Sequence, residues 1–443
     1  MSNYQKPRGT DDVYGSEITK WHYIEALIRE ICYLYRYHEI RTPIFEHTEV
    51  YKRQEDSSDM VNKEMYTFDD NGGRSLTLKP EGTAGIIRAF VENKLYNTTD
   101  LPLKLYYIAP NFRYERPQKG RMRIHYQFGV EAIGEKNPTV DVEVIFLGYS
   151  LLTALGLQDL KVLVNTLGDD ESRSAYRSAL KTHFKQHLAS MCPDCQKRYE
   201  QNPLRILDCK VDKEHPAMLS APEISDYLSE QAKTYFASVL NDLKLLGIDY
   251  QIEPKLVRGL DYYSDTVFEV VSCNKDMGSQ ATIFGGGRYD KLVEYYGGPK
   301  MSGIGFGMGI ERLLVALEAE GIDVAQPHEC DLYIMPLDAS YQSEALALAT
   351  IARSNGFTTD MDYQKRSMKA QFKAADRANA KVIAILGEDE IKSSQVTLKN
   401  TLTKDQVTVS YFDLLATLES WLVEEEDIDE PHDHENCDCT HHH

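Results

Sequence analysis

The first part of the chain combines helical and strand periodicities, which predicts a mixed α/β domain. Apolar residues recur at helical spacing from Trp21 to Tyr37. The segment 40–45 is extended and contains Pro43, which cannot donate to a β-ladder, so this strand is expected at a sheet edge or an interface. Thr83 is expected to cap a helix over 84–91, with Glu81 beside its positive end.

A β-hairpin is predicted with arms at 103–117 and 121–134 and a tip at 118–120. In the return arm the even positions are mostly apolar, whereas the odd positions are Arg121, Arg123, His125, Gln127, Gly129 and Glu131. A solvated antiparallel face gives the same alternation. However, cations gather at one end, and an amide and a carboxylate lie farther along. This arrangement suits a substrate with phosphates at one end and an amino acid at the other.

Four glycines occupy every second position from 303 to 309. In a strand they share one face, while Ile304, Phe306 and Met308 point into a core. Such a bare face suits a flat ring such as a purine, or tight packing against another element. Arg312 follows in the first turn of the next predicted helix, where it can reach a phosphate tail. The spacing is not that of a dinucleotide-binding G-x-G-x-x-G loop.

Two further segments carry polar chemistry. In the first, Arg258 adjoins a glycine and is followed by Tyr262 and Tyr263. Tyr263 and Glu131 together can supply the donor and the acceptor that an imidazole ring needs. The second segment begins with the glycine triplet 285–287, expected to form a mobile loop or a plain turn, and it contains Tyr289.

The pattern of predicted helices and strands changes twice along the chain, which predicts two domains and an insertion. Residues 1–325 form the first domain, in which a helical, charged stretch over about 170–250 is interpreted as an insertion. Alternating strands and helices then predict a separate α/β domain over 328–423 with a mostly parallel sheet. The acidic residues 424–443 are expected to form a disordered tail, which ends in histidines that are either native or a tag.

The 443-residue chain carries a formal charge of −20, so nucleic acid must be bound through local basic patches. Basic residues recur every four positions and are predicted to form one stripe on a helix: Lys365, Lys369, Lys373, Arg377 and Lys381. The stripe is either a solvated face or a nucleic-acid surface. An apolar leader and a membrane-spanning run are both absent from the sequence, so a cytoplasmic location without membrane association is expected.

The eight cysteines are unevenly spaced and are interpreted as reduced thiols. Three of them and a histidine have zinc-like spacing: Cys192, Cys195, Cys209 and His215. A full tetrahedral set is not evident, so no metal-binding side chain is assigned. Ordinary thiols remain the alternative. The tail residues His432, His434, Cys437 and Cys439 are assigned no role.

These motifs resemble those of the histidyl-tRNA synthetases, a family of class II aminoacyl-tRNA synthetases, from Lys6 to about Val423. The three general class II motifs resemble 37–51, 112–131 and 303–313. The two stretches specific for histidine resemble 256–263 and 284–290, and further family stretches resemble 8–12, 78–83 and 202–208. The resemblance implies an α+β catalytic domain, with a mostly antiparallel sheet flanked by helices, followed by an anticodon-binding α/β domain.

The resemblance also implies the reaction, which is the ATP-dependent activation of L-histidine to histidyl-adenylate and its transfer to the 3' end of tRNA(His). The residues expected to hold histidine are Glu81, Thr83, Gln127, Glu131, Tyr262, Tyr263 and Tyr289. Those expected to bind ATP, together with Mg²⁺, are Arg113, Arg121, Arg312, Gly303, Gly305 and Gly307. Arg258 and Arg113 are the expected catalytic residues.

The resemblance further implies contacts with tRNA and a homodimer with the Pro43 strand at its interface. The acceptor end is expected at Arg116 and Gln118, and the anticodon at Lys365, Lys369, Lys373 and Arg377. The sequence departs from the family pattern at Ile124-His125-Tyr126, where glutamine, phenylalanine and often histidine are expected. Lys79 likewise stands where arginine is commoner.

Two other functions remain as alternatives. The first is a non-catalytic histidine-sensing regulatory subunit on the same fold, which lacks the C-terminal domain and usually loses the arginines of the ATP site. The second is a general tRNA-binding or scaffolding protein, which leaves the glycine strand unexplained.

Overall fold

The computed structural model describes residues 4–52, 60–258, 262–325 and 329–422. The chain divides into two compact units, residues 1–325 and 326–443. The predicted acidic tail, including its histidines, lies outside the described residues.

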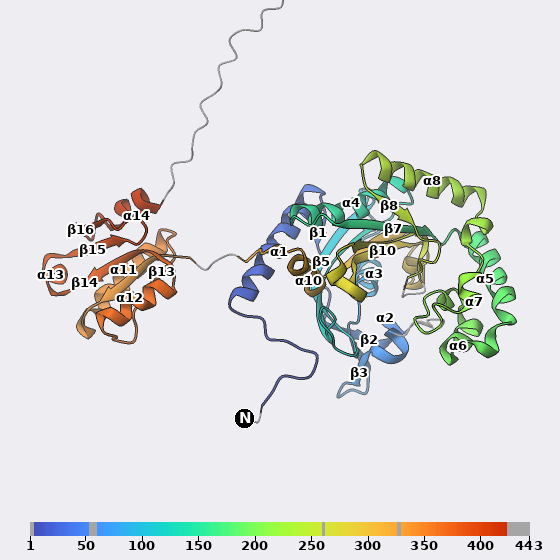
Figure 1. Cartoon of the computed structure of the whole chain (residues 1–443), viewed down its shortest axis with the longest axis horizontal. Helices are drawn as coiled ribbons and strands as arrows, with labels where there is room; N and C mark the ends of the chain where they lie inside the picture. The colour runs from blue at the N-terminus through green and yellow to red at the C-terminus, as the bar shows by residue number, and fades with distance from the viewer. Residues whose placement is uncertain (1–3, 53–59, 259–261, 326–328, 423–443) are drawn as a thin grey trace, which may run out of the picture. The chain divides into compact units, whose positions relative to one another are not determined.

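The first unit is built on an eight-stranded sheet in the order β1-β5-β6-β11-β10-β9-β7-β8. Several of its strands, such as β5, β7 and β10, are labelled in Figure 1. Its strands are β1 His38–Glu39, β5 Leu103–Phe112, β6 Ile124–Ile133, β7 Leu160–Thr166, β8 Tyr250–Ile252, β9 Ser264–Ser272, β10 Thr282–Tyr289 and β11 Gly303–Gly309. Neighbouring strands from β5 to β7 pair antiparallel, and only the edge strands β1 and β8 pair parallel. The expected mostly antiparallel sheet is therefore confirmed.

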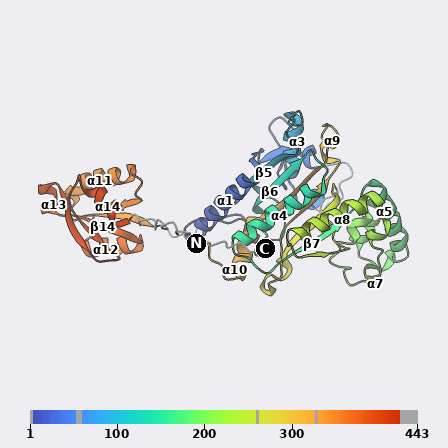
Figure 2. The ribbon, with the colours of Figure 1, turned by 90° about the horizontal axis from the view of Figure 1, so that it is seen from above.

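The two faces of this sheet differ as the alternation predicted. Most even-numbered residues of β6 and β11, such as Val130 and Ile304, are buried, although Tyr126 near the start of β6 is exposed. The rings of Phe128 and Phe306 meet edge to face at 5.4 Å. This core lies beneath helix α4 Pro138–Ala154, with α1 Ser16–Leu34 and α8 Glu230–Leu245 on either side (Figure 2). Burying each large apolar side chain contributes about 1.5–3 kcal/mol. The opposite face of the sheet is left for polar chemistry.

On that opposite face lie α3 Thr83–Glu92 and α9 Leu292–Tyr295, which share a smaller core with β5. A three-stranded sheet in the order β2-β4-β3 is formed by β2 Phe45–His47, β4 Ser75–Leu78 and β3 Tyr66–Asp69. The strand predicted over 40–45 is wrong in its extent. Residues 40–44 connect β1 in the large sheet to β2 in the small one. At one end the Ile40 N–H donates to Tyr106 O in the large sheet, and at the other end Ile44 O accepts the Lys79 N–H next to the small sheet.

Two predicted loops also differ. The hairpin arms are shorter than predicted, since residues 113–123 lie outside β5 and β6. The Arg113 N–H donates to Arg123 O at 2.9 Å, and a bridge between Gln118 and Arg121 closes the tip. The prediction of a mobile loop at 285–287 is wrong, because these glycines lie inside β10. A Cβ atom on Gly286 would overlap the backbone of Gly305, so the triplet permits close approach of two strands.

The insertion has its own small core, whose buried members include Leu180, Phe184, Ile206 and Met218. Its main elements are α5 Asp170–Lys185, α6 Pro193–Gln201, the 3₁₀ helix η3 Pro203–Ile206 and α7 Pro216–Leu219. Helix α8 follows and packs on α4 and β9 of the main sheet. The insertion proper therefore ends before α8.

The second unit contains a five-stranded sheet in the order β13-β12-β14-β15-β16. Its elements are β12 Cys330–Pro336, α11 Gln342–Ser354, β13 Thr359–Met361, α12 Met368–Arg377, β14 Ala380–Leu386, α13 Glu388–Ser393, β15 Gln395–Asn400, β16 Gln406–Ser410 and α14 Leu414–Leu422. β13, β12 and β14 are parallel, as predicted. The antiparallel pair β15 and β16, which the sequence pattern did not reveal, makes the sheet mixed. Within the described ranges, no helix has the length and apolar character needed to cross a membrane.

Candidate active site

A cavity of about 350 Å³ opens on the polar face of the large sheet. It brings together side chains from α3, β6, β10, β11, α10 Ile310–Ala319 and the segment before β9. The predicted site residues that line it are Glu81, Thr83, Arg113, Arg121, Gln127, Glu131, Arg258, Tyr262, Tyr263, Tyr289, Gly305, Gly307 and Arg312. The residues expected to bind histidine and ATP thus share one cavity, with the exception of Gly303.

The carboxylate of Glu81 caps helix α3. Its two oxygens accept the backbone N–H groups of Thr83 at 2.8 Å and Ala84 at 3.0 Å. The prediction that Thr83 is the cap is therefore wrong. Thr83 is the first helical residue, and its hydroxyl does not cap the helix but donates to Glu131 in the cavity. Glu81 is held at the positive end of the helix, as expected.

Glu131 is the centre of a buried hydrogen-bond group. It is 1% exposed, and it accepts the Thr83 hydroxyl at 2.6 Å and the Tyr289 hydroxyl at 2.7 Å. Burial raises the pKa of Glu131 to about 8, against the opposing effect of these two donors. A donor or cation that enters the cavity and contacts Glu131 therefore stabilises its ionised form.

Two residues that the sequence analysis missed hold Gln127. Its Oε1 atom accepts the Tyr107 hydroxyl at 2.9 Å and the Asn111 amide at 2.8 Å. Both partners are odd-numbered residues of β5, like Arg113 just after it, and therefore lie on the polar face. Applying the same alternation to the first arm of the hairpin would have identified them from the sequence. The Tyr107 ring lies against Gly82 and Gly129, where a Cβ atom would overlap it. These glycines make room for the ring that positions Gln127.

The bare face of β11 accommodates side chains of the site. Gly303 lies beneath the Tyr289 ring, Gly305 beneath the Glu131 carboxylate and Gly307 beneath the Gln127 amide. A Cβ atom on any of the three would overlap these groups. Gly303 is consequently covered and does not line the cavity, contrary to its expected ATP contact. Gly305, Gly307 and Gly309 do line the cavity, so contact of a flat ring with this part of the strand stays a prediction.

Four arginines converge on the other end of the cavity, and each is anchored. Arg113 donates to Pro80 O at 2.8 Å, and Arg312 donates to Thr282 O at 2.9 Å. Arg121 pairs with Glu115, and Arg258 pairs with Glu269 at 2.5 Å. Burial, together with the nearby Arg121, lowers the pKa of Arg312. Crowded cations of this kind favour a polyanionic ligand.

His125 stands among these cations at a position where the sequence departs from the family pattern. Burial and the neighbouring Arg113 lower the pKa of His125 to about 3. The ring is therefore neutral at physiological pH. It adds an aromatic surface to the cavity without adding charge.

The insertion supports Arg258 from behind. The guanidinium of Arg205, in η3, donates to the backbone carbonyl of Arg258 at 3.1 Å. The Arg258 guanidinium itself lies 5.9 Å from the centre of the Tyr263 ring, and the Tyr262 and Tyr263 rings are 4.7 Å apart. The hydrogen bond from Arg205 to the Arg258 carbonyl gives the family stretch at 202–208 a structural role. Residues 259–261 of the histidine-specific stretch lie outside the described residues.

Some polar residues near the site do not line the cavity. Arg116 and Gln118 are exposed at the hairpin tip. Arg123 was predicted on the polar face but stacks on Tyr114 at 4.0 Å, because β6 begins only at Ile124. Arg288, which the sequence analysis did not assign, is completely buried and donates to Asp141 through Nε at 3.0 Å. Arg288 thus lies within the histidine-specific stretch 284–290 but forms a buried ion pair with Asp141 in the core.

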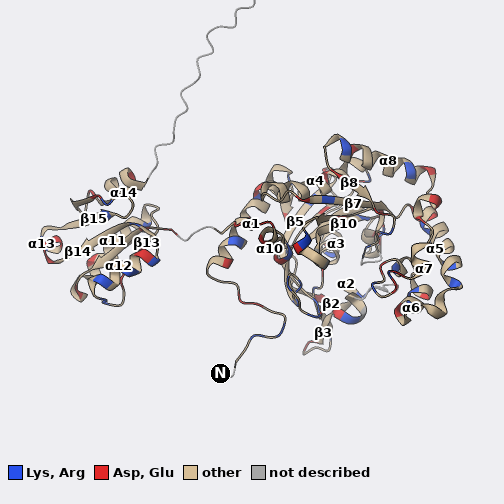
Figure 3. Cartoon of the chain, viewed as in Figure 1, with Lys and Arg blue, Asp and Glu red and all other residues tan. Residues whose placement is uncertain are grey.

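The basic stripe of the second unit is shorter than predicted. Lys369, Lys373 and Arg377 are exposed along α12, and the exposed Lys365 precedes this helix. Figure 3 marks basic positions of α12 in blue. Lys381 lies in β14, where it pairs with Glu329 at 2.5 Å and Asp331 at 3.4 Å. The prediction that Lys381 belongs to the basic stripe is therefore wrong. Helix α12 ends at Arg377, and the spacing of four does not continue on one surface beyond it.

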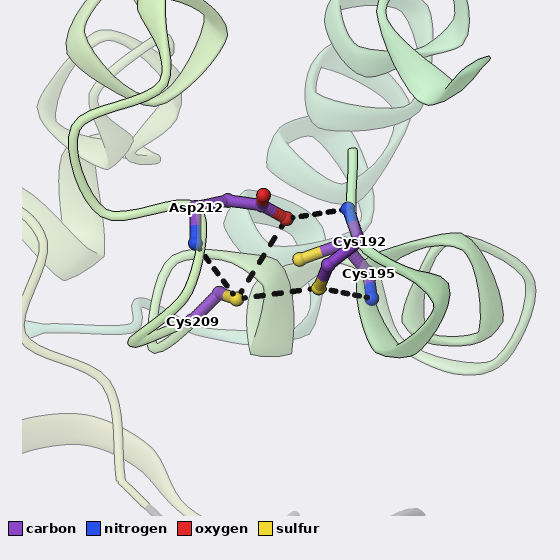
Figure 4. Close-up of side chains that lie close together, drawn as sticks. All are labelled: Cys192, Cys195, Cys209 and Asp212. Carbon is purple, nitrogen blue, oxygen red and sulfur yellow. Dashed lines mark hydrogen bonds between the residues drawn. The ribbon is translucent and has the colours of Figure 1, made fainter. Parts of the chain in front are cut away.

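The zinc-like cysteines do gather, with a different fourth residue. Sulfur atoms of Cys192, Cys195 and Cys209 lie with the Asp212 carboxylate within 4.8 Å of one another (Figure 4). His215 instead hydrogen-bonds Ser190 and the backbone of Ala217. A fourth donor, which was not evident from the sequence, is therefore present beside the three sulfurs. The missing donor is Asp212, which zinc-type cysteine and histidine spacing does not reveal.

Comparisons with known proteins agree on one family. The family model "Histidyl-tRNA synthetase" matches residues 9–313, and "Anticodon binding domain" matches 331–421. The chain is 51% identical over 417 residues to the histidine–tRNA ligase of Oceanobacillus iheyensis, covering 94% of the chain and 97% of that relative. It is 50% identical over 408 residues to the Bacillus subtilis (strain 168) histidine–tRNA ligase, covering 92% and 96%. Among solved structures, apo S. aureus histidyl-tRNA synthetase is similar, with a TM-score of 0.80, 40% identity, and coverage of 94% and 99%.

Proposed function

The chain belongs to the histidyl-tRNA synthetase family, and we propose that its main cavity is where histidine and ATP react. The reaction is the ATP-dependent charging of tRNA with histidine. The main support for this cavity is that groups suited to an amino acid and groups suited to phosphates line it together. A buried carboxylate with hydroxyl donors occupies one end, and four arginines occupy the other.

In this proposal histidine lies over the β6 end of the cavity. Glu131 and Tyr263 contact the imidazole ring as acceptor and donor, and Glu81, Thr83 and Gln127 hold the amino-acid backbone. Tyr262 and Tyr289 complete the pocket. The buried hydrogen bonds of Glu131 support this placement, since a pocket built from fixed polar partners rejects analogues that lack the matching group.

The arginines then act on the phosphates. The carboxylate of bound histidine attacks the α-phosphorus of ATP in line, and pyrophosphate leaves, so no protein nucleophile is required. Arg113 and Arg258 neutralise the α-phosphate as negative charge develops, while Arg121 and Arg312 hold the phosphate tail. Losing one such fixed donor costs about 3 kcal/mol in the transition state.

Mg²⁺ is part of this proposal as a cofactor. The cation binds oxygen, usually through one or two carboxylates together with substrate phosphates. Glu115, Glu269 and Glu311 line the cavity, the first two as partners of Arg121 and Arg258, so carboxylate donors that fit Mg²⁺ are present beside the arginines. When bound, the metal supplies further neutralisation of the phosphates.

The tRNA is proposed to meet both units. Its acceptor end approaches the exposed hairpin tip at Arg116 and Gln118, and its anticodon contacts Lys365, Lys369, Lys373 and Arg377. Phosphate contacts through these residues make tRNA affinity fall steeply with salt. A Michaelis constant for tRNA that is independent of salt would overturn the basic surface on α12. A homodimer and a cytoplasmic location complete the proposal.

Histidine-dependent exchange of labelled pyrophosphate into ATP tests the proposed site. Exchange is expected in the purified protein and is expected to be lost when Arg113 or Arg258 is replaced. The histidine-sensing alternative predicts histidine binding without exchange. It is not favoured, because the chain retains both the C-terminal domain and the arginines at the cavity.

A further inference from the structure

The cluster in the insertion has the composition of a closed metal site. Cys195 and Cys209 are buried and Cys192 is half-buried, and all three sulfurs point toward the carboxylate of Asp212 (Figure 4). We propose that Cys192, Cys195, Cys209 and Asp212 bind one structural zinc ion. Thiolate ligands favour zinc over magnesium or calcium, and four protein donors leave no position open for catalysis.

Two distances between donor atoms match those of a tetrahedral zinc site. With zinc–sulfur bonds of about 2.3 Å, two sulfur ligands of a tetrahedral site stand about 3.8 Å apart. The sulfurs of Cys192 and Cys209 are 3.7 Å apart, and Cys209 Sγ is 3.8 Å from Asp212 Oδ2. A disulfide needs about 2.05 Å between its sulfurs, so the cysteine pair is arranged as ligands and not as a bridge.

Two similar turns supply the four donors. In each turn the first residue is a cysteine, and the residue three positions later is the second donor: Cys192 with Cys195, and Cys209 with Asp212. In each, the sulfur of the first cysteine accepts the backbone N–H of the second donor at 3.4 Å. The Cys192 N–H also donates to Asp212 Oδ2 at 3.0 Å. Hydrogen bonds of this kind orient thiolate and carboxylate ligands and stabilise their charge.

The proposed ion joins two segments on either side of η3. One turn begins α6, and the other follows η3, so the ion closes the chain around Arg205. Arg205 in turn donates to the Arg258 carbonyl in the main cavity. The zinc site therefore positions Arg258 indirectly. This last step rests on the proposed function, whereas metal binding itself does not.

The first test measures zinc in the full chain after gel filtration, without substrates. Wild type is compared with C192S/C209S and with C437S/C439S, a matched pair that removes two thiols of the tail. About one zinc per chain is expected in wild type and in C437S/C439S, and none in C192S/C209S. A wild-type protein that retains no zinc after incubation with zinc sulfate would overturn the proposal, as would zinc that is lost only with the tail cysteines.

Cobalt spectroscopy keeps the proposal testable if C192S/C209S fails to fold. Full-length protein loaded with Co²⁺ is expected to show thiolate-to-cobalt charge-transfer bands and the strong visible bands of tetrahedral cobalt. D212N retains all three thiolates and is expected to bind cobalt at least about tenfold more weakly. Wild-type spectra without charge-transfer bands, or D212N affinity equal to wild type, would contradict the ligand set.

The proposal that the zinc site positions Arg258 is tested by removing zinc with a chelator. Because the chelator also removes Mg²⁺, Mg²⁺ is then restored before the reaction is measured. Pyrophosphate exchange is expected to fall at least about tenfold and to recover with zinc but not with more Mg²⁺. An unchanged rate in zinc-free protein would overturn the link to Arg258. Because zinc is counted without substrates, this result is distinguishable from failure of the proposed function.

Discussion

The Tyr289 hydroxyl donates to Glu131 Oε2 at 2.7 Å across the glycine strand β11, which lies between the strands that carry the two residues. Side chains on strands two places apart in a sheet are usually separated by a side chain of the middle strand. Gly303 and Gly305 remove this obstacle, because the Tyr289 ring and the Glu131 carboxylate lie directly over them. The glycines thus allow a buried acceptor and its donor to meet beneath the proposed histidine pocket.

Tyr289→Phe removes this donor while it keeps the ring. Bound histidine favours the ionised form of Glu131, and a hydrogen bond to a charged group contributes about 1.5–3 kcal/mol, so histidine Kd is expected to rise by about tenfold or more. Isothermal titration with histidine measures the change. Tyr295→Phe, on a half-exposed tyrosine of α9, is the control and is expected to leave histidine Kd unchanged. Equal histidine affinity in Tyr289→Phe and wild type would show that Glu131 does not depend on this bond.

Gly305→Ala tests the role of the bare strand. Its Cβ atom would overlap the Glu131 carboxylate and the backbone of Val130, so Glu131 must move and histidine Kd is expected to rise at least about tenfold. Gly309→Ala is the matched control, since its Cβ atom meets only Arg312 Cβ at an ordinary 3.6 Å. Histidine titration of both variants decides the matter. Similar histidine affinities would remove the steric explanation for the alternating glycines.

The sequence pattern predicted these faces well because side-chain direction in a strand is a local property. The alternation of side chains along a strand was enough to predict that Gln127 and Glu131 share one face and that Ile304 and Phe306 lie in the core. Where the sequence analysis failed, the deciding partner was distant in sequence. The glycines at 285–287 are an ordinary turn signal, and only their pairing with the distant strands β9 and β11 makes them part of a strand. Asp212 likewise acquires its significance from cysteines up to twenty positions away.

The pKa of Glu131 makes stability depend on pH in a defined direction. Burial raises it from 4.5 to about 8 in the folded protein, so between these values the native state holds a proton that the unfolded state has lost. Wild-type stability therefore falls by about 1.4 kcal/mol per pH unit from this group as pH rises through the window. Below the window both states are protonated, and above it both are ionised, so the contribution is constant there.

Glu131→Gln cannot titrate, so its melting temperature relative to wild type is expected to increase from pH 5 to pH 8 in the absence of histidine. Thermal unfolding of both proteins at these two pH values measures the difference. Other buried carboxyl groups, such as Glu311, are present in both proteins and cancel. A difference in melting temperature that stays constant between pH 5 and pH 8 would mean that Glu131 titrates normally.

Arg258→Ala is expected to separate chemistry from binding. In the proposed mechanism this arginine stabilises charge that develops at the α-phosphorus, so the exchange rate at saturating substrates is expected to fall about a hundredfold or more. Histidine affinity is expected to change much less, because the guanidinium lies toward the phosphate end, paired with Glu269. Pyrophosphate exchange and histidine titration measure the two effects separately. Equal losses in both would make Arg258 a binding residue only.

The Glu269 carboxylate complicates this variant, since removing Arg258 leaves it without its ion-pair partner at 2.5 Å. An unpaired carboxylate beside the phosphates would itself slow the reaction by repulsion. The double variant Arg258→Ala/Glu269→Gln removes this charge. If the missing cation is the cause, exchange in the double variant stays about as slow as in Arg258→Ala. Recovery toward the wild-type rate would instead assign the loss to Glu269, and the catalytic role of Arg258 would have to be abandoned.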